Sequence, residues 1–257
     1  MAIGIPLWQL QVATAIGLLG VWIGWRGGMN KMVGFYDLPA ATKLLLYGFF
    51  FGVLYGFLAV DLVMRPMWTG FLPPLLPALL VALGISMTTM FLLTRESVRR
   101  LKGQPTAGWA FGLGMGSMLV VRLIYEVFAF PEDLGHWIYG FNAASIALAL
   151  GLVLTVPWTE AIISSWQGWN ALEGRRFKPA FKAMLVRAML LFILTFGVVY
   201  PVALLFLPPF IMWGQTRADQ IWLPSGLSPR MKQEWSRLTR TGIATGVRAV
   251  SMVDEEE

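Results

Sequence analysis

The sequence predicts an all-α integral membrane protein, a polytopic bundle of about six transmembrane helices. Of its 257 residues, 57% are hydrophobic and only 13% are charged, whereas a soluble domain averages about 25% charged residues. The mean hydropathy is +0.65. A helix that crosses a bilayer needs roughly 20 apolar residues. Six segments come close to this length: residues 7–25, 44–64, 71–93, 109–130, 137–157 and 185–207.

The first, third and last segments each need a separate justification. Residues 1–25 hold no Lys or Arg, and the following "GWRGGMNK" is not a small-residue cleavage site, so we expect a true helix rather than a signal peptide. The prolines of "FLPPLLPALL" (71–80) fall mostly in the first turns of a helix, where proline is tolerated. Three prolines between residues 201 and 209 break or kink the last segment, which is expected to be bent or to turn back within the membrane.

Lys and Arg are distributed unevenly between the loops, which predicts the orientation in the cell membrane. Basic residues gather in cytoplasmic loops. The loop "MRPMWTG" has only Arg65 and "PEDLGHW" has no basic residue, whereas the alternate loops are rich in them. This places the N-terminus outside. The residues expected on the cytoplasmic side are Arg26, Lys31, Lys43, Arg95, Arg99, Arg100, Lys102, Arg175, Arg176, Lys178, Lys182 and Arg187.

The chain is expected to divide into a transmembrane domain, residues 1–213, and a basic, partly disordered C-terminal tail, residues 214–257. Six crossings from an outside N-terminus would leave this basic tail outside. A last segment that re-enters the membrane would instead bring the tail into the cytoplasm, and its positive charge favours that side.

Glycines recur at a spacing of four in three of the predicted helices. This spacing places them on one helix face, where two backbones can approach closely. The pattern predicts close packing inside one subunit, an interface between subunits, or a slot for a flat lipid or cofactor. The glycines are Gly20, Gly24 and Gly28, then Gly48, Gly52 and Gly56, and finally Gly108, Gly112 and Gly116.

Four charged residues lie near the outer ends of two apolar segments. Asp61 and Arg65 are one helical turn apart, as are Arg122 and Glu126, and the order of signs is reversed between the two helices. Asp61 can therefore face Arg122 while Arg65 faces Glu126. A single charge at mid-membrane costs about 2.5–3.5 kcal/mol on insertion scales, and pairing offsets part of this. With a glycine face and a charged face each, these two helices are expected to be central in the bundle.

Two interpretations of these four charges stay open. They form an ion-paired lock between the helices, or they form a polar site open to the outer leaflet that handles a proton, an ion or a polar head group. Glu132, Asp133 and the single histidine, His136, follow on the outer loop. A solvated loop is the expected place for His136.

The residue inventory excludes several classes of site. With no Cys and one His, the chain has no thiolate nucleophile and no multi-His haem or metal site. It has no His-Glu-x-x-His, no Walker A loop and no Gly-x-Ser-x-Gly. We therefore expect no metal and no cofactor. The net charge of +6 is explained by the basic loops, so no nucleic-acid binding is expected.

Residues 94–126 carry one family resemblance. The stretches "TRESVRRLKGQ" and "WAFGLGMGSMLVVRLIYE" resemble the core of PrsW/YhfC-type membrane peptidases, in which a Glu-Glu helix end precedes a basic loop and a Gly-rich helix bearing an acid. The likeness covers about an eighth of the chain. Arg95 stands at the first acidic position, only Glu96 remains, the Gly-rich helix has no acid before Glu126, and the metal-binding histidines are lacking. The resemblance therefore implies a non-catalytic relative.

Three functional classes remain. The glycine faces and the missing catalytic motifs favour a non-enzymatic subunit or scaffold that packs against membrane lipids and against other membrane subunits or further copies of itself. A small transporter or channel would use the four charges, but no inverted repeat is evident. A lipid-modifying or proteolytic enzyme would use scattered carboxylates such as Asp61, Glu126 and Glu160. Glu160, three residues after Pro157, is expected to be a helix cap or a solvated interfacial acid.

Overall fold

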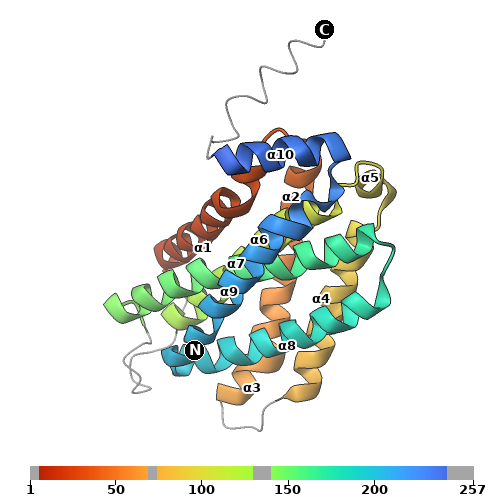
Figure 1. Ribbon diagram of the computed structural model, residues 1–257. Coiled ribbons are helices and arrows are strands. Elements are labelled where there is room, and N and C mark those ends of the chain that lie inside the picture. Colours follow the sequence, from red (N-terminus) through yellow and green to blue (C-terminus); the bar gives the residue numbers. More distant parts are fainter. Residues whose placement is uncertain (1–5, 69–73, 130–139, 242–257) are drawn as a thin grey trace.

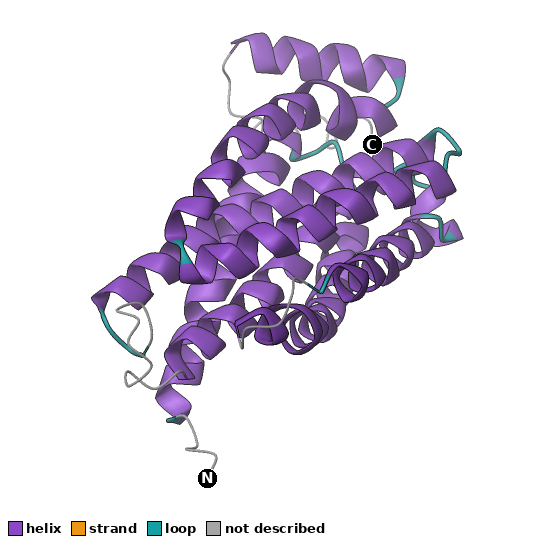
Figure 2. Ribbon diagram, turned by 90° about the horizontal axis from the view of Figure 1, so that it is seen from below, coloured by secondary structure: helices purple, strands orange, loops and turns teal. Residues whose placement is uncertain are grey.

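The computed structural model describes residues 6–68, 74–129 and 140–241, and over these residues it is an all-α bundle without strands (Figures 1 and 2). The predicted fold class is therefore confirmed. Six of the described helices are long and apolar enough to cross a membrane. They are α1 (Leu7–Gly28), α2 (Leu38–Ala59), α4 (Leu75–Leu93), α6 (Gln104–Ala129), α7 (Ala143–Leu172) and α8 (Phe177–Val199).

Shorter elements extend or join these helices. A 3₁₀ turn, η1 (Met29–Met32), follows α1, and α5 (Glu96–Arg99) lies between α4 and α6. A π-helical turn, η2 (Val60–Met64), continues α2 into α3 (Arg65–Trp68). After α8 the chain forms η4 (Pro201–Phe206), α9 (Leu207–Arg217), η5 (Ala218–Trp222), η6 (Leu223–Gly226) and α10 (Pro229–Thr241).

Helix α6 is the centre of the bundle. In its most apolar stretch 83% of the residues are buried, against 39% in α2 and 22% in α1. It packs against α7 on one side and against α1 and α2 on another. The expectation that both charged helices are central is therefore right for α6 and wrong for α2. The glycine face of α2 packs against α6, whereas Leu46 and Phe50 on α2 are exposed.

Helix α7 does not end at Pro157, as the sequence led us to expect, but continues to Leu172. Proline removes one intrahelical hydrogen bond, and here glycines of two neighbouring helices, Gly20 and Gly116, pack directly on the proline ring or its Cα atom. Tight packing around the proline thus holds the helix together. Two residues after the helix ends, Gly174 has a φ of +79°, which suits a glycine in the turn that follows.

Helix α8 begins at Phe177, eight residues before the predicted start. The stretch that was expected to be a basic loop is therefore largely helical, and Lys178, Lys182 and Arg187 lie in its first three turns. Arg187 is fully buried, so its placement among the cytoplasmic loop residues was wrong. The physical reason is that buried partners on other helices satisfy its charge.

After α8 the chain turns back along the bundle. Pro201 opens the 3₁₀ turn η4, and Leu207 begins α9, which packs against α7. The residues from 201 to 226, here called the return segment, thus run from the end of α8 toward the bundle end that carries α5 and α10 (Figure 1). The boundary expected at residues 213 and 214 falls inside α9, where Gly214 is buried against Ile162.

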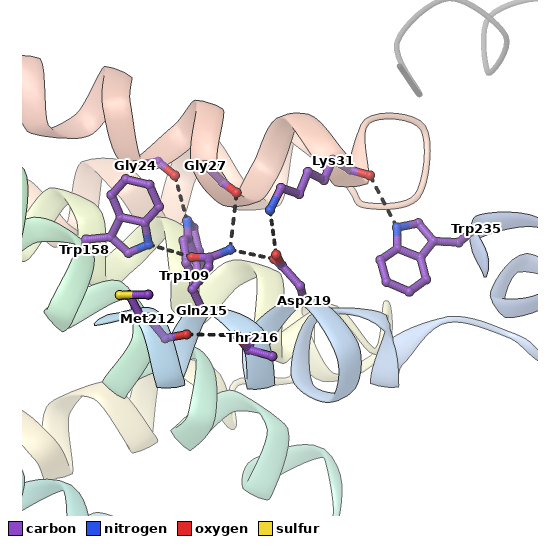
Figure 3. A network of polar contacts seen from close by, with 10 residues as sticks. All are labelled: Gly24, Gly27, Lys31, Trp109, Trp158, Met212, Gln215, Thr216, Asp219 and Trp235. Carbon is purple, nitrogen blue, oxygen red and sulfur yellow. Dashed lines mark hydrogen bonds and ion pairs between the residues drawn. The ribbon is translucent and has the colours of Figure 1, made fainter. Parts of the chain in front are cut away.

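Hydrogen bonds fasten the return segment to α1 and α7 (Figure 3). The Trp158 indole donates to Gln215 Oε1 at 2.6 Å, and Gln215 Nε2 donates to the Gly27 carbonyl at 3.3 Å and to Asp219 Oδ1 at 2.6 Å. Lys31 Nζ lies 2.5 Å from the second oxygen of Asp219. The far end of the return segment is therefore fixed beside η1, at the end of the bundle where α1 stops.

The return segment leads to a testable topology. As helix, residues 207–226 span about 30 Å, which is the thickness of a bilayer core. We expect this segment to bring α10 to the side of the basic loops. In the cysteine-free chain, Ser236→Cys should react with an impermeant thiol reagent from the same side as Arg99→Cys. His136→Cys, outside the described residues, should react from the opposite side. Labelling of positions 236 and 136 from one side would refute this topology.

Candidate functional site

The structure brings the four charged residues Asp61, Arg65, Arg122 and Glu126 together, and they are called the four-charge cluster below. Arg65 lies 2.9 Å from Glu126 and 3.1 Å from Asp61. Arg122 pairs with Glu126 and lies 3.5 Å from Asp61. Each arginine therefore contacts both carboxylates, and the formal charge of the cluster is zero.

The two members on α6 are buried, and the two on the α2 side are not. The side chains of Arg122 and Glu126 are 12% and 8% exposed, whereas those of Asp61 and Arg65 are 42% and 49% exposed. The Arg122 guanidinium also lies 5.0 Å from the ring centre of Phe57, within range of a cation–π interaction. The cluster thus has a fixed inner half and an outer half on the flank of the bundle.

Asp61 lies in the π-helical turn η2. Such single turns insert an extra residue into an α-helix and are frequent at functional sites. Here the turn comes directly after the glycine face of α2, where Gly56 packs against the Arg122 side chain. This arrangement brings Asp61 and Arg65 beside the two charges of α6.

A second group of polar residues is entirely buried, and the sequence analysis did not find it as a group. Arg187 Nε donates to Glu160 Oε2 at 2.9 Å. Its terminal nitrogens donate to Ser86 Oγ at 2.9 Å, to Gln167 Oε1 at 2.7 Å and to Ser164 Oγ at 2.8 Å. These five residues, called the buried network below, join α4, α7 and α8 at 0% exposure.

Glu160 is therefore neither a helix cap nor a solvated interfacial acid, and that expectation is corrected. Its carboxylate is held by Arg187 in the interior, and Tyr55 of α2 lies near enough to interact with its charge. A signal was present in the sequence. Glu160, Ser164 and Gln167 follow the spacing i, i+4 and i+7, which places all three on one helix face within an apolar run.

The predicted helix-packing glycines all lie at close approaches inside the chain. Gly24 and Gly28 meet side chains of α6, and Gly20 meets Pro157 of α7. The triplet of α2 also faces α6, and that of α6 faces α7. At Gly56 the nearest obstacle to a Cβ atom is the Arg122 side chain. At five of the nine positions it is the backbone of the neighbouring helix: Gly48, Gly52, Gly108, Gly112 and Gly116.

The acidic residues of the peptidase-like stretch do not converge. Glu96 lies in α5, exposed and paired with Arg100 at 2.7 Å, before α6 begins. Glu126 lies near the other end of α6, about 33 Å along the helix from its first residue. Glu160 belongs to the buried network and not to the four-charge cluster. Among the described residues, no group of three or more His, Asp or Glu side chains could hold a metal ion.

A small cleft of about 300 Å³ opens at the end of the bundle that carries α5 and α10. Tyr36, Lys102 and Met231 are among its lining residues. Burial raises the pKa of the Tyr36 phenol above its ordinary value, partly opposed by a hydrogen bond with Trp25. The phenol is therefore neutral at physiological pH and supplies no anion to this cleft.

The chain matches no family model, no curated protein and no solved structure.

Proposed function

We propose that the protein is a non-enzymatic subunit of a membrane complex and that the exposed half of its four-charge cluster docks a partner. This proposal rests mainly on the position of Asp61 in η2 and Arg65 in α3, the two turns that continue α2. They continue a helix face that exposes Phe57, and Leu62 beside them is 48% exposed. Apolar side chains of this kind contact lipid in a membrane, and charged groups in that surrounding are unfavourable unless another polar group covers them.

The chemistry of the cluster defines the partner. Asp61 and Arg65 present a negative and a positive charge one helical turn apart. A partner with the two charges in the reverse order can pair with both. A partner helix with a polar or charged pair at the same depth meets this requirement. A second copy of the chain related by a two-fold axis also meets it, because Asp61 of one copy can then face Arg65 of the other.

The close packing of the helices in the interior supports a subunit rather than a transporter. Backbones of α2, α6 and α7 approach too closely to admit a Cβ atom at Gly48, Gly108 or Gly112. Helices packed in this way do not slide or separate without losing many contacts. The buried network further links α4, α7 and α8 through a charge pair whose separation is costly.

The pairing within the four-charge cluster determines which charge-exchange variant can still fold and so test the proposed docking. Exchanging only Asp61 and Arg122 would place two arginines one turn apart in η2 and α3, and two acids one turn apart on α6. Both like-charged pairs would repel each other. Inverting all four charges keeps every internal pair. The variant Asp61→Arg, Arg65→Asp, Arg122→Glu, Glu126→Arg should therefore fold, yet it presents the opposite order of charges to a partner.

We expect the full inversion to lose the partner that co-purifies with the wild-type protein in mild detergent. The matched control inverts the exposed pair of α5, Glu96→Arg with Arg100→Glu, and should keep that partner at wild-type stoichiometry. The readouts are the partner-to-protein ratio and the elution volume of the folded protein. A folded inversion variant that retains the partner would show that the cluster is only an internal lock.

A small proton transporter is a second candidate, because some buried hydroxyl groups lack a protein partner. In the described part of the chain, the hydroxyls of Ser117, Thr159 and Ser165 are buried without a hydrogen-bond acceptor or donor. Such groups commonly bind internal water. They lie on α6 and α7, between the four-charge cluster and the opposite end of the bundle, where a proton path would have to run.

A further inference from the structure

An open groove of about 810 Å³ lies between α1 and α2. Both helices pack against α6. On α1 the groove is lined by a stripe at spacing four that includes Leu18, Trp22 and Arg26. On α2 it is lined by Thr42, Leu45 and Phe49, at spacings of three and four. The groove therefore runs parallel to the two helices.

The groove changes from polar to apolar along its length. Arg26 and Thr42 lie toward the end of the bundle that carries the basic loops, and Leu18 and Phe49 lie deeper. Eight residues of helix separate Leu18 from Arg26, about 12 Å. Two tryptophans, Trp22 and Trp25, line the groove beside Arg26, and tryptophan is typical of the level of lipid head groups.

The polar end of the groove carries positive charge. Arg26 is exposed and lies 5.0 Å from the ring centre of Trp22. Lys43, next to Thr42, lies 5.9 Å from the ring centre of Tyr47. In the described residues no ion pair joins either side chain to a carboxylate. The charge of Arg26, which lines the groove, can therefore interact with an anion that enters between the helices.

We propose that this groove binds one anionic phospholipid from the leaflet next to the basic loops. Its phosphate lies at Arg26 and Thr42, and an acyl chain follows Leu18, Leu45 and Phe49. The charge of the polar end, the apolar depth and the flanking tryptophans together match this class of ligand and no soluble anion. The inference does not depend on the proposed docking of a partner, because the groove lies along the first half of α2 and the four-charge cluster lies beyond its end.

Native mass spectrometry with competing lipids tests the proposal. Purified protein is mixed with phosphatidylglycerol and phosphatidylcholine, and the ratio of the two bound lipids is measured. A basic side chain near a lipid surface contributes on the order of a fivefold preference for anionic lipid. We therefore expect Arg26→Gln to lower the ratio about fivefold. The matched control is Arg95→Gln. Arg95 lies 5.1 Å from the ring centre of Phe91, a contact similar to that of Arg26, but it lies outside the groove.

A second variant tests the apolar part. Leu45→Trp fills the groove and should reduce the binding of both lipids, while added inorganic phosphate should displace neither. An unchanged ratio in Arg26→Gln would overturn the proposal, as would an equal loss in Arg95→Gln. Full lipid binding by Leu45→Trp, or displacement by phosphate, would equally overturn it.

Discussion

Arg187→Met is expected to abolish most of the folded protein. The substitution leaves the Glu160 carboxylate at 0% exposure without its charge partner. It also removes the donor that serves Ser86, Ser164 and Gln167. Breaking one side of a buried ion pair typically costs about 3–5 kcal/mol. This is a large fraction of the stability of a folded domain. The measurement is the yield of monodisperse protein and the apparent Tm followed by tryptophan fluorescence.

Two controls separate the charge from the packing of the side chain. Arg187→Met combined with Glu160→Met removes both charges and should recover part of the Tm, because no uncompensated charge remains. Arg100→Met breaks the exposed pair with Glu96 and should change stability by less than about 1 kcal/mol. A Tm of Arg187→Met equal to that of Arg100→Met would mean that the buried network does not hold α8 in place.

Gly112→Ala is the second substitution with a large expected effect. A Cβ atom at position 112 would collide with the carbonyl oxygen of Glu160 and would lie 2.7 Å from the Ala161 Cα atom. These obstacles are backbone atoms, which cannot rotate away, so α6 and α7 must separate. Overpacking of this kind costs about 1–3 kcal/mol. The shift also moves the backbone that carries Glu160, and the apparent Tm should fall clearly.

The matched control is Gly151→Ala on α7, where a Cβ atom would meet nothing within 4 Å. Alanine is favoured over glycine in a helix by about 1 kcal/mol, so Gly151→Ala should leave the Tm unchanged or raise it. Equal Tm values for the two variants would show that α6 and α7 are not in close backbone contact at Gly112.

The all-α membrane fold could be predicted from composition and segment length because a bilayer admits few spanning structures. Helix boundaries were less predictable. Pro157 breaks a helix in isolation, but Gly20 and Gly116 pack against it here, and this tertiary contact is not visible in local sequence. The direction of the return segment depends on the bonds of Gln215 with Trp158 and Gly27, which join residues far apart in the chain.

The four-charge cluster could be predicted from the sequence, whereas the buried network largely could not. In the four-charge cluster, the spacing of four between Asp61 and Arg65 and between Arg122 and Glu126 is explicit. Their reversed order already suggests a match across two helices. Arg187 was assigned to a loop because Arg near an apolar segment usually marks a membrane boundary. Its burial depends on partners that two other helices, α4 and α7, contribute. In the sequence, only the helical spacing of Glu160, Ser164 and Gln167 indicates such a site.

The mass of the particle that mild detergent extracts from native membranes tests most directly whether the bundle is a subunit. The proposed function predicts a particle that exceeds the 28.6 kDa chain by a fixed mass of protein, either a different subunit or a second copy. The variant with all four charges of the cluster inverted should be extracted without this additional protein mass. A single chain that carries only lipid, and that moves protons after reconstitution into sealed liposomes, would contradict a subunit and favour a transporter.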